Sequence, residues 1–371
     1  MEKLPGPDAA PHVLSSSPSV WGRGGAGFTI QHDGERVTMT GKDQLQLQAS
    51  VNSFFLRSSL TAQDLANCYD LVEKLYPDRL VSAASCQGYC SLTLYVGDDM
   101  VIQFRPHKYR LDMRITAMAR EVYGMYAPET RCMVTLPGSG LIVYSMKRIA
   151  GTTFRDFTER QSILALSTCS RAGLCKDLAI FFSKSWARAG TSGFPLGLVG
   201  QSMGMRLRSL TKNLPQRFRP VARRALENLH SVRALPWVLT HGDLVAGNIM
   251  VDPSSGRLTG LVDWAEAEVL PFGTCFYGLE EMLGEMTTSG FQYRQDATEL
   301  RLVFWAELEK HIPELGRSRV LEAVKVARDI GVLLWHGIAF DNGAIDRVVQ
   351  EGRDIEEIYR LDAFLSMGSK L

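Results

Sequence analysis

Residues 238–264 read VLTHGDLVAGNIMVDPSSGRLTGLVDW and carry the clearest structural pattern in the chain. Two apolar runs within it, 249–251 and 258–262, have the length and composition of short β-strands. The segment between them, DPSSG, consists of residues that favour tight turns. The stretch therefore predicts a β-hairpin, preceded by an apolar run at 238–240 and by a loop that begins with His241.

Three oxygen-bearing side chains fall at one end of this hairpin. Asp243 lies five positions before Asn248, which directly precedes the first strand, and Asp263 directly follows the second strand. Phosphoryl transfer requires a carboxylate that orients or deprotonates the attacking hydroxyl, and oxygen ligands that hold Mg²⁺ against the phosphates. Protein kinases place their residues for this chemistry in the same order. We predict that Asp243 is the catalytic base and that Asn248 and Asp263 are metal ligands. A surface hairpin with turn-forming polar residues is the alternative interpretation.

The segment resembles the signature of the aminoglycoside phosphotransferase and choline kinase family: His-Gly-Asp, four residues, Asn, and a hydrophobic strand that ends in Asp-Trp. The likeness extends over roughly residues 80–340 and is closest to an uncharacterised fungal branch. It implies a two-lobed, protein-kinase-like α+β fold, with a small antiparallel-sheet lobe and a larger, mainly helical lobe. It also implies ATP and Mg²⁺ as cofactors, and a His241 that braces the loop by hydrogen bonding rather than by titrating.

The composition is that of a soluble globular protein. The chain has 371 residues, of which 45% are hydrophobic and 22% are charged, and this length is sufficient for two lobes. Lys and Arg number 41 against 40 Asp and Glu, so there is no electrostatic case for nucleic acid or membrane binding. No apolar run approaches the roughly 18 residues of a spanning helix, and no signal peptide is evident. We predict a cytoplasmic protein with a small-molecule partner, and its oligomeric state stays open.

The pattern along the chain divides it into four parts. The first, residues 1–26, is rich in Pro, Ser and Gly and is predicted to be a disordered tail. The second, residues 27–79, is an appendage to the small lobe, with a helix that begins after Thr61. The third, residues 80–150, is the small nucleotide-covering lobe. The fourth, residues 151–371, is the helical lobe with the catalytic hairpin and the acceptor site.

The small lobe is predicted to bind the nucleotide. Its strands are expected at residues 81–85, 91–96, 100–105 and 141–146. Backbone N–H groups near the first strand tip, around Gly88 and Ser91, are expected to face phosphate oxygens. The end of the last strand, Met146–Lys147, resembles the family's connector, where backbone groups contact the adenine. Gly151 then allows a sharp turn into the large lobe.

One position departs from the family pattern. The third strand in relatives carries a Lys or Arg that contacts the α- and β-phosphates, and alignment places Gln103 there. Arg105 lies two residues further on the same face of the strand and is the candidate substitute. The resemblance implies that a carboxylate of the following helix orients this cation, and Asp112 fits that role better than Glu121. Catalysis would be slow or absent if neither Gln103 nor Arg105 contacts phosphate.

The large lobe is predicted to be helical on both sides of the hairpin. A Gly-rich stretch, residues 191–204, is expected to be a loop, and helices are expected at 276–286, 296–311, 318–338 and 353–365. After the hairpin, Glu266 is expected to assist the metal or to contact a cationic substrate, with a plain surface acid as the alternative. Glu268 is expected to brace the loop.

These patterns favour ATP-dependent phosphorylation of a hydroxyl (or amine) group on a small molecule. Asp263 is followed within ten residues by Pro271, without an Ala-Pro-Glu-type activation segment, which disfavours a protein substrate. The alternative is a kinase fold that has lost phosphorylation, either a pseudokinase scaffold or a pocket recruited for other chemistry in secondary metabolism. Gln103 motivates this alternative, and so does Lys147, where most relatives have an acidic residue.

Overall fold

The structure is a computed structural model, and it describes residues 29–32, 35–38, 41–85, 87–160, 168–189, 196–341 and 344–366. The predicted disordered tail and residues 191–195 of the predicted Gly-rich loop lie outside these ranges. In the described part of the chain, no helix is long and apolar enough to cross a membrane.

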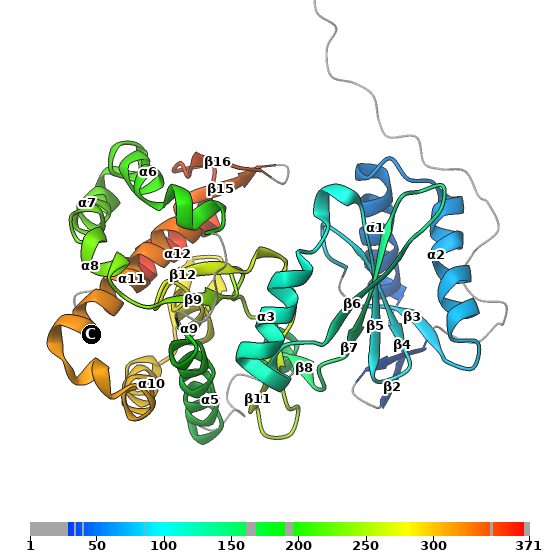
Figure 1. The fold of residues 1–371 in the computed structure, drawn as a ribbon, viewed down its shortest axis with the longest axis horizontal. Helices are drawn as coiled ribbons and strands as arrows, with labels where there is room; N and C mark the ends of the chain where they lie inside the picture. The colour runs from blue at the N-terminus through cyan, green and yellow to red at the C-terminus, as the bar shows by residue number, and fades with distance from the viewer. Residues whose placement is uncertain are drawn as a thin grey trace, which may run out of the picture.

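The smaller of two lobes is built on a five-stranded antiparallel sheet with the strand order β3-β4-β5-β7-β6 (Figure 1). Its strands are β3 (Val81–Ala83), β4 (Leu92–Val96), β5 (Met100–Arg105), β6 (Thr130–Thr135) and β7 (Ile142–Lys147). Burial alternates along β4, because successive side chains point to opposite faces of the sheet. The predicted antiparallel lobe is therefore confirmed, and β6 is a strand that the sequence did not predict.

Two N-terminal helices share the core of this sheet. They are α1 (Gly41–Arg57) and α2 (Ala62–Leu75), and they follow a short hairpin of β1 (Thr29–His32) and β2 (Glu35–Thr38). Phe54 of α1 and Val72 of α2 are fully buried in one cluster with Leu94 of β4. As predicted, α2 begins after Thr61, which forms a capping box with Asp64. The appendage is thus part of the small lobe's hydrophobic core.

Helix α3 (Met113–Tyr123) lies between the two lobes (Figure 1). Its buried side chains pack into the core of the larger lobe. Tyr123 stacks on Phe181 with ring centroids 4.2 Å apart, and its ring centroid lies 5.1 Å from that of Trp264. The Tyr123 hydroxyl donates a hydrogen bond to the Leu239 carbonyl oxygen. Through these contacts α3 joins the small lobe to the strand and loop that carry the predicted site.

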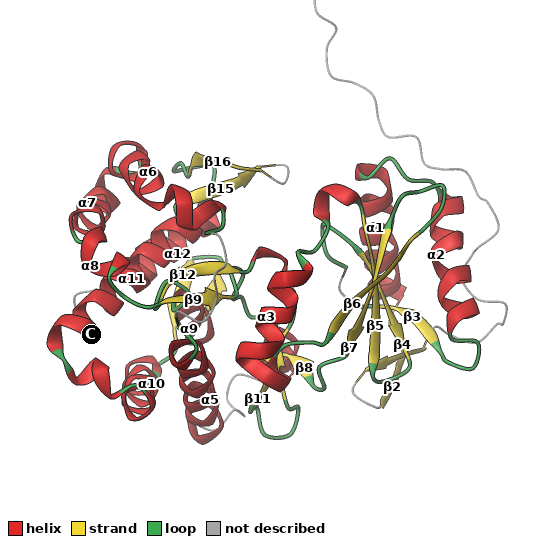
Figure 2. Cartoon of the chain, in the orientation of Figure 1, coloured by secondary structure: helices red, strands yellow, loops and turns green. Residues whose placement is uncertain are grey.

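The larger lobe is mainly helical (Figure 2). Its helices are α4 (Phe154–Arg160), α5 (Thr168–Ala187), α6 (Leu198–Asn213), α7 (Arg219–Glu227), α8 (Leu229–Arg233), α9 (Tyr277–Met282), α10 (Ala297–His311), α11 (Ser318–His336) and α12 (Ile355–Ser366). Its short strands are β8 (Thr152–Thr153), β9 (Trp237–Thr240), β10 (Ile249–Val251), β11 (Leu258–Leu261), β12 (Glu268–Pro271), β13 (Gly284–Thr287), β14 (Gly290–Tyr293), β15 (Ile338–Asp341) and β16 (Ala344–Val348). The helices predicted after the hairpin correspond to α9–α12, but the one predicted at 276–286 ends at Met282, and residues 284–286 belong to β13 instead. The hairpins β13–β14 and β15–β16 were not predicted.

The prediction of a loop over residues 191–204 is wrong for its second half. Helix α6 begins at Leu198 and contains Gly200 and Gly204, both buried. A Cβ atom on Gly200 would lie 3.3 Å from the Val269 carbonyl oxygen. Glycine normally weakens a helix, but here it allows α6 to pack closely against β12. The glycines that suggested a loop are therefore needed for close packing of the helix.

A buried ionic cluster holds the helices of this lobe together. Glu280 of α9 accepts hydrogen bonds from Arg301 Nη2 at 2.7 Å and from Tyr293 Oη at 2.8 Å. Arg328 Nη2 lies 2.9 Å from the other Glu280 oxygen. Glu280, Arg301 and Arg328 are each at most 2% exposed. Burial opposes ionisation of Glu280, but the nearby guanidinium groups outweigh it and hold its pKa below the ordinary value.

We expect Glu280→Gln to destabilise the protein by about 3–5 kcal/mol, because it leaves the buried Arg301 without a carboxylate and Arg328 with Asp329 alone. Urea unfolding followed by circular dichroism measures this change. Glu299→Gln is the matched control, since Glu299 lies exposed on α10, and it should change stability by less than about 0.5 kcal/mol. Equal stabilities of the two variants would contradict a structural role for the cluster.

Candidate active site

The hairpin brings the ends of its two strands together as predicted. Strands β10 and β11 pair antiparallel, with Ile249 opposite Leu261. The Val262 N–H donates a hydrogen bond of 3.0 Å to the carbonyl oxygen of Asn248. Asn248, which precedes β10, therefore lies at the same end of the hairpin as Asp263, which follows β11.

Two backbone conformations fix the loops at this end. Gly242 has a φ of +78°, and a Cβ atom there would overlap the Glu266 carbonyl oxygen, so only glycine allows this approach. Asp263 has φ 60° and ψ 66°, in the left-handed region that non-glycine residues seldom adopt. Such conformations cluster at functional sites, where the surrounding structure maintains them. Together they bring the His241–Asp243 loop against the turn at 264–266.

Asp243 and Asn248 contact each other directly. Asn248 Nδ2 donates hydrogen bonds of 2.9 Å to both the carbonyl oxygen and Oδ2 of Asp243. Burial, followed by repulsion from Asp263, raises the pKa of Asp243 to about 6. A carboxylate with such a pKa is mostly ionised at neutral pH and accepts a proton more readily than an ordinary aspartate. The arrangement is suited to general-base chemistry.

His241 has the contacts of a bracing residue. It is buried, Nε2 donates to the Val262 carbonyl oxygen at 2.8 Å, and the Asp243 N–H donates to Nδ1 at 3.3 Å. Burial lowers its pKa to about 4, so the ring is neutral at neutral pH. Its bonds fix the backbone on both sides of the site without using its charge.

Arg105 is the cation that connects the small lobe to the hairpin. Its Nη2 lies 3.2 Å from Asp263 Oδ1, and its Nε donates to Gln103 Oε1 at 3.0 Å. Gln103 Nε2 in turn donates to Thr93 Oγ1 at 3.3 Å. The Arg105 side chain is only 3% exposed, whereas that of Asp263 is 44% exposed. Gln103 therefore orients Arg105, and Arg105 supplies the charge.

The structure does not bring Asp112 to this cation. Asp112 is the N-cap of α3, and its Oδ2 pairs with Arg114 Nη2 at 2.6 Å. The carboxylate partner of Arg105 is instead Asp263, which lies 158 positions away in the chain. A pairing across such a distance leaves no local signal in the sequence.

Gly88 and Ser91 lie in the loop between β3 and β4. They are close to each other: a Cβ atom added to Gly88 would lie 3.5 Å from Ser91 Oγ. Ser91 is buried, with its Oγ 3.4 Å from Thr93 Oγ1. Two residues that the sequence did not single out hold this loop. Gln87 Nε2 donates to the Thr93 carbonyl oxygen at 2.9 Å. The guanidinium of Arg57, from α1, lies 4.1 Å above the Tyr89 ring.

Met146 and Lys147 end β7, at the connector between the lobes. The Lys147 N–H donates to the Glu129 carbonyl oxygen at 2.8 Å and is thus used within the fold. The Lys147 side chain is exposed. Gly151 has a φ of +108°, and a Cβ atom there would overlap the Val251 carbonyl oxygen, as the predicted sharp turn requires.

Another residue that the sequence did not single out is Arg155 of α4. Its backbone N–H donates to the Ala246 carbonyl oxygen at 3.1 Å, and its guanidinium lies beside Gly247. Its positive charge is one of the influences that lower the pKa of Asp243. Arg155 therefore adds a second cation to the loop that carries the predicted base.

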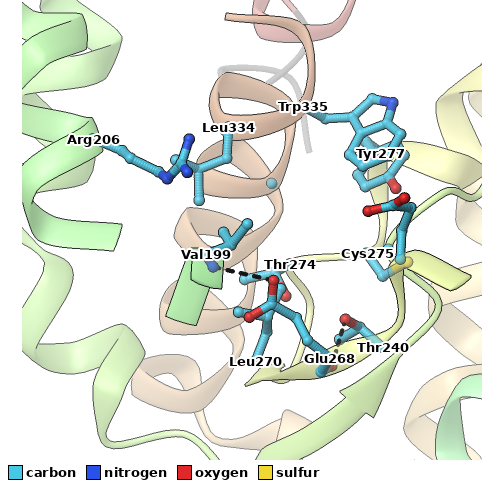
Figure 3. A pocket seen from close by; sticks show the side chains of 13 residues that line it. Val199, Arg206, Thr240, Glu268, Leu270, Thr274, Cys275, Tyr277, Leu334 and Trp335 are labelled. Carbon is cyan, nitrogen blue, oxygen red and sulfur yellow. Dashed lines mark hydrogen bonds between the residues drawn. The ribbon is translucent and has the colours of Figure 1, made fainter. Parts of the chain in front are cut away.

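A cavity of about 70 Å³ lies next to this loop (Figure 3). Thr240, Gly242 and Glu266 line it, which places it beside Asp243. Burial, followed by the charge of Asp263, raises the pKa of Glu266. Glu268 also lines the cavity, and its carboxylate accepts hydrogen bonds from the backbone N–H groups of Val199 and Gly200 at 3.1 and 2.9 Å. Glu268 thus braces the start of α6.

The donor set fits a magnesium ion. Asp263 offers an exposed carboxylate, and Asn248 offers an amide oxygen. Repulsion from Asp263 contributes to the raised pKa of Asp243, and a cation bound between the two carboxylates would relieve this repulsion. In the described residues, no group of three or more His, Cys, Asp or Glu side chains forms a metal-binding cluster. Magnesium requires no such cluster, because it is held by one or two carboxylates together with phosphates and water.

The two lobes and the grouping of Asp243, Asn248 and Asp263 agree with the predicted phosphotransferase. Residues 118–273 match the model of the phosphotransferase enzyme family. The matched segment includes the entire predicted catalytic hairpin, and it confirms the resemblance to the phosphotransferase family that the sequence suggested.

Individual relatives are distant. The uncharacterized protein YcbJ of Bacillus subtilis (strain 168) is 35% identical over 89 residues, which is 24% of this chain and 28% of that protein. The chain thus aligns with less than a third of the length of this curated relative. Among solved structures, similarity extends to the GDP and kanamycin complex of APH(2″)-IIIa, with 14% identity, 72% of this chain, 90% of that chain and a TM-score of 0.48. APH(3″)-Id from Streptomyces rimosus ATCC10970 shows 14% identity over 72% of this chain and 98% of that chain, with a TM-score of 0.45.

Proposed function

We propose that this protein is an ATP-dependent kinase that phosphorylates a hydroxyl group of a small molecule. The observation that carries the proposal is the convergence of Asp243, Asn248 and Asp263 at one end of the hairpin, with Arg105 reaching the same point from the small lobe. The nearby cavity provides a place for the acceptor beside Asp243.

Each residue has a role in this proposal. Asp243 accepts the proton of the attacking hydroxyl, and Asn248 keeps the Asp243 carboxylate in place. Asn248 and Asp263 would hold the metal, which when bound neutralises charge on the phosphates. Arg105, oriented by Gln103, faces the phosphates from the small lobe, and the loop around Gly88 and Ser91 covers them.

The second candidate is a kinase fold that does not phosphorylate. It is favoured by Gln103, which stands where relatives carry a cation, and by the Lys147 N–H, which is used within the fold. Arg105 argues against it, because a guanidinium retained beside Asp263 restores the missing charge.

Calorimetric titration with Mg-ATP separates the two candidates. We expect saturable heat with a micromolar to millimolar dissociation constant, and weaker binding of Mg-ATP by Asp263→Asn, because a charged metal ligand is replaced by a neutral one. Asp252→Asn is the matched control, since Asp252 lies in the exposed turn of the same hairpin. No heat at millimolar Mg-ATP would overturn the kinase proposal and favour the non-phosphorylating candidate.

A further inference from the structure

The cavity beside the catalytic loop is lined by one cation, Arg206, that forms no ion pair with any described residue. Arg206 of α6 extends into it from the side opposite Tyr277 and Trp335 (Figure 3). Among the described residues, the Arg206 side chain makes one hydrogen bond, from Nε to Ser202 Oγ at 2.7 Å, and no carboxylate lies within ion-pair distance of it. A guanidinium with unused N–H donors at a cavity is suited to bind a carboxylate in a two-pronged manner.

Neither carboxylate that lines the cavity forms an ion pair with Arg206, and the Arg206 charge acts on Glu268 only as a longer-range influence that lowers its pKa. Glu268 is held by the N–H groups of Val199 and Gly200, so the first turn of α6 compensates its negative charge. Glu266 is coupled to Asp263, on the side of the predicted metal ligands. The guanidinium of Arg206 is thus available to bind a ligand at the far side of the cavity.

The walls between these charged ends are apolar. Leu270, Leu334 and Trp335 line the cavity, and the Trp335 ring is stacked on Tyr277 with centroids 5.3 Å apart and an angle of 10°. The Tyr277 hydroxyl accepts a hydrogen bond from the Leu244 N–H at 3.1 Å, which ties this wall to the catalytic loop. Apolar walls favour a hydrocarbon body between two polar ends.

The volume limits the size of that body. The cavity holds about 70 Å³, whereas an engineered cavity of about 150 Å³ accommodates benzene. A multi-ring amino sugar would extend out of this cavity, and its ammonium groups would be repelled by Arg206. A short aliphatic chain meets both conditions.

We propose that the acceptor is a compact hydroxy carboxylic acid, an inference that rests on the proposed kinase function. Its carboxylate pairs with Arg206, its aliphatic chain lies against Leu270 and Leu334, and its hydroxyl lies at the catalytic loop. In the reaction the hydroxyl oxygen forms a bond to the γ-phosphorus of ATP. The bond from that phosphorus to the β–γ bridging oxygen breaks, Asp243 takes the hydroxyl proton, and ADP leaves. The product is a phosphorylated acid.

Calorimetry with a series of straight-chain ω-hydroxy acids of increasing length tests this inference, with the corresponding amides as neutral analogues. We expect one chain length to bind best, and its carboxylate to bind about 10- to 100-fold more tightly than its amide, as for hydrogen bonds to a charged group. Arg206→Gln should remove that preference. Arg208→Gln, two positions further on the exposed side of α6, should retain it.

Two results would overturn the inference: equal affinity of acids and amides, or no binding of any acid at millimolar concentration. Binding of the acids is measured without nucleotide, and Mg-ATP binding is measured separately. Acid binding that depends on Arg206, together with no Mg-ATP binding, would refute the kinase proposal and leave the acid site standing. Mg-ATP binding without acid binding would refute the acid site alone.

Discussion

Asp243→Asn is expected to reduce the rate of phosphoryl transfer by about 10²- to 10⁴-fold, the usual contribution of a positioned general base. The amide retains the size of the carboxylate and still accepts the hydrogen bond from Asn248, so the loop keeps its geometry. Mg-ATP affinity should change little, because a group that acts mainly in the transition state contributes little to ground-state binding. Release of ADP in the presence of an acceptor measures the rate, and calorimetry measures the affinity.

The same substitution is expected to stabilise the protein at neutral pH by about 1–3 kcal/mol. The pKa of Asp243 rises from 3.8 to about 6 on folding. Because the folded state disfavours the ionised form, the wild-type protein loses stability as the pH rises through this interval. The amide that replaces the carboxylate does not titrate, so the stability difference should develop between pH 3.8 and about 6. Urea unfolding at several pH values measures it.

A matched aspartate provides the control for both effects. Asp252 lies in the exposed turn of the same hairpin, where Ser254 and Ser255 lower its pKa to about 2. Asp252→Asn should therefore retain the rate of phosphoryl transfer. An Asp243→Asn protein that turns over as fast as the wild type would show that Asp243 is not the base.

Arg105→Met is expected to lower kcat/KM by about 10²-fold or more, since it removes the charge that connects the small lobe to Asp263. Methionine keeps much of the buried volume, so the loss reports the guanidinium rather than packing. Gln103→Ala should have a smaller effect of about tenfold, because it frees Arg105 to move but leaves the charge. Steady-state kinetics with varied ATP measures both changes.

Arg110→Met is the control for Arg105, because Arg110 is an exposed arginine of the same lobe. Its kcat/KM should match that of the wild type. A larger loss in Gln103→Ala than in Arg105→Met would instead identify the amide as the phosphate contact. Equal activity of all three variants would show that Arg105 has no role in the reaction.

The sequence predicted the features that depend on neighbouring residues. The hairpin of β10 and β11 follows from two apolar runs and a turn, so the proximity of Asn248 and Asp263 was predictable. The capping box of Thr61 and the turn at Gly151 are equally local. The predicted same-face position of Gln103 and Arg105 follows from strand geometry, and their side chains indeed meet at 3.0 Å.

Features that depend on distant residues were missed. Arg105 pairs with Asp263 rather than with Asp112, because the two lobes converge only in the folded chain. The bond from Glu268 to the start of α6 joins residues that are 68 and 69 positions apart. The glycines of α6 suggested a loop, since close packing against β12 has no signature in the helix itself.

The shared core of the small lobe has a practical consequence for anyone who trims this chain. The match to the phosphotransferase family model begins at residue 118, within α3, whereas Phe54 and Val72 are packed against the sheet far upstream of that point. A fragment cut at the similarity boundary would lose β3, β4 and β5 together with both N-terminal helices. The segment that matches the family model is therefore smaller than the packed core that contains it, and the helices before the sheet belong in any fragment made for study.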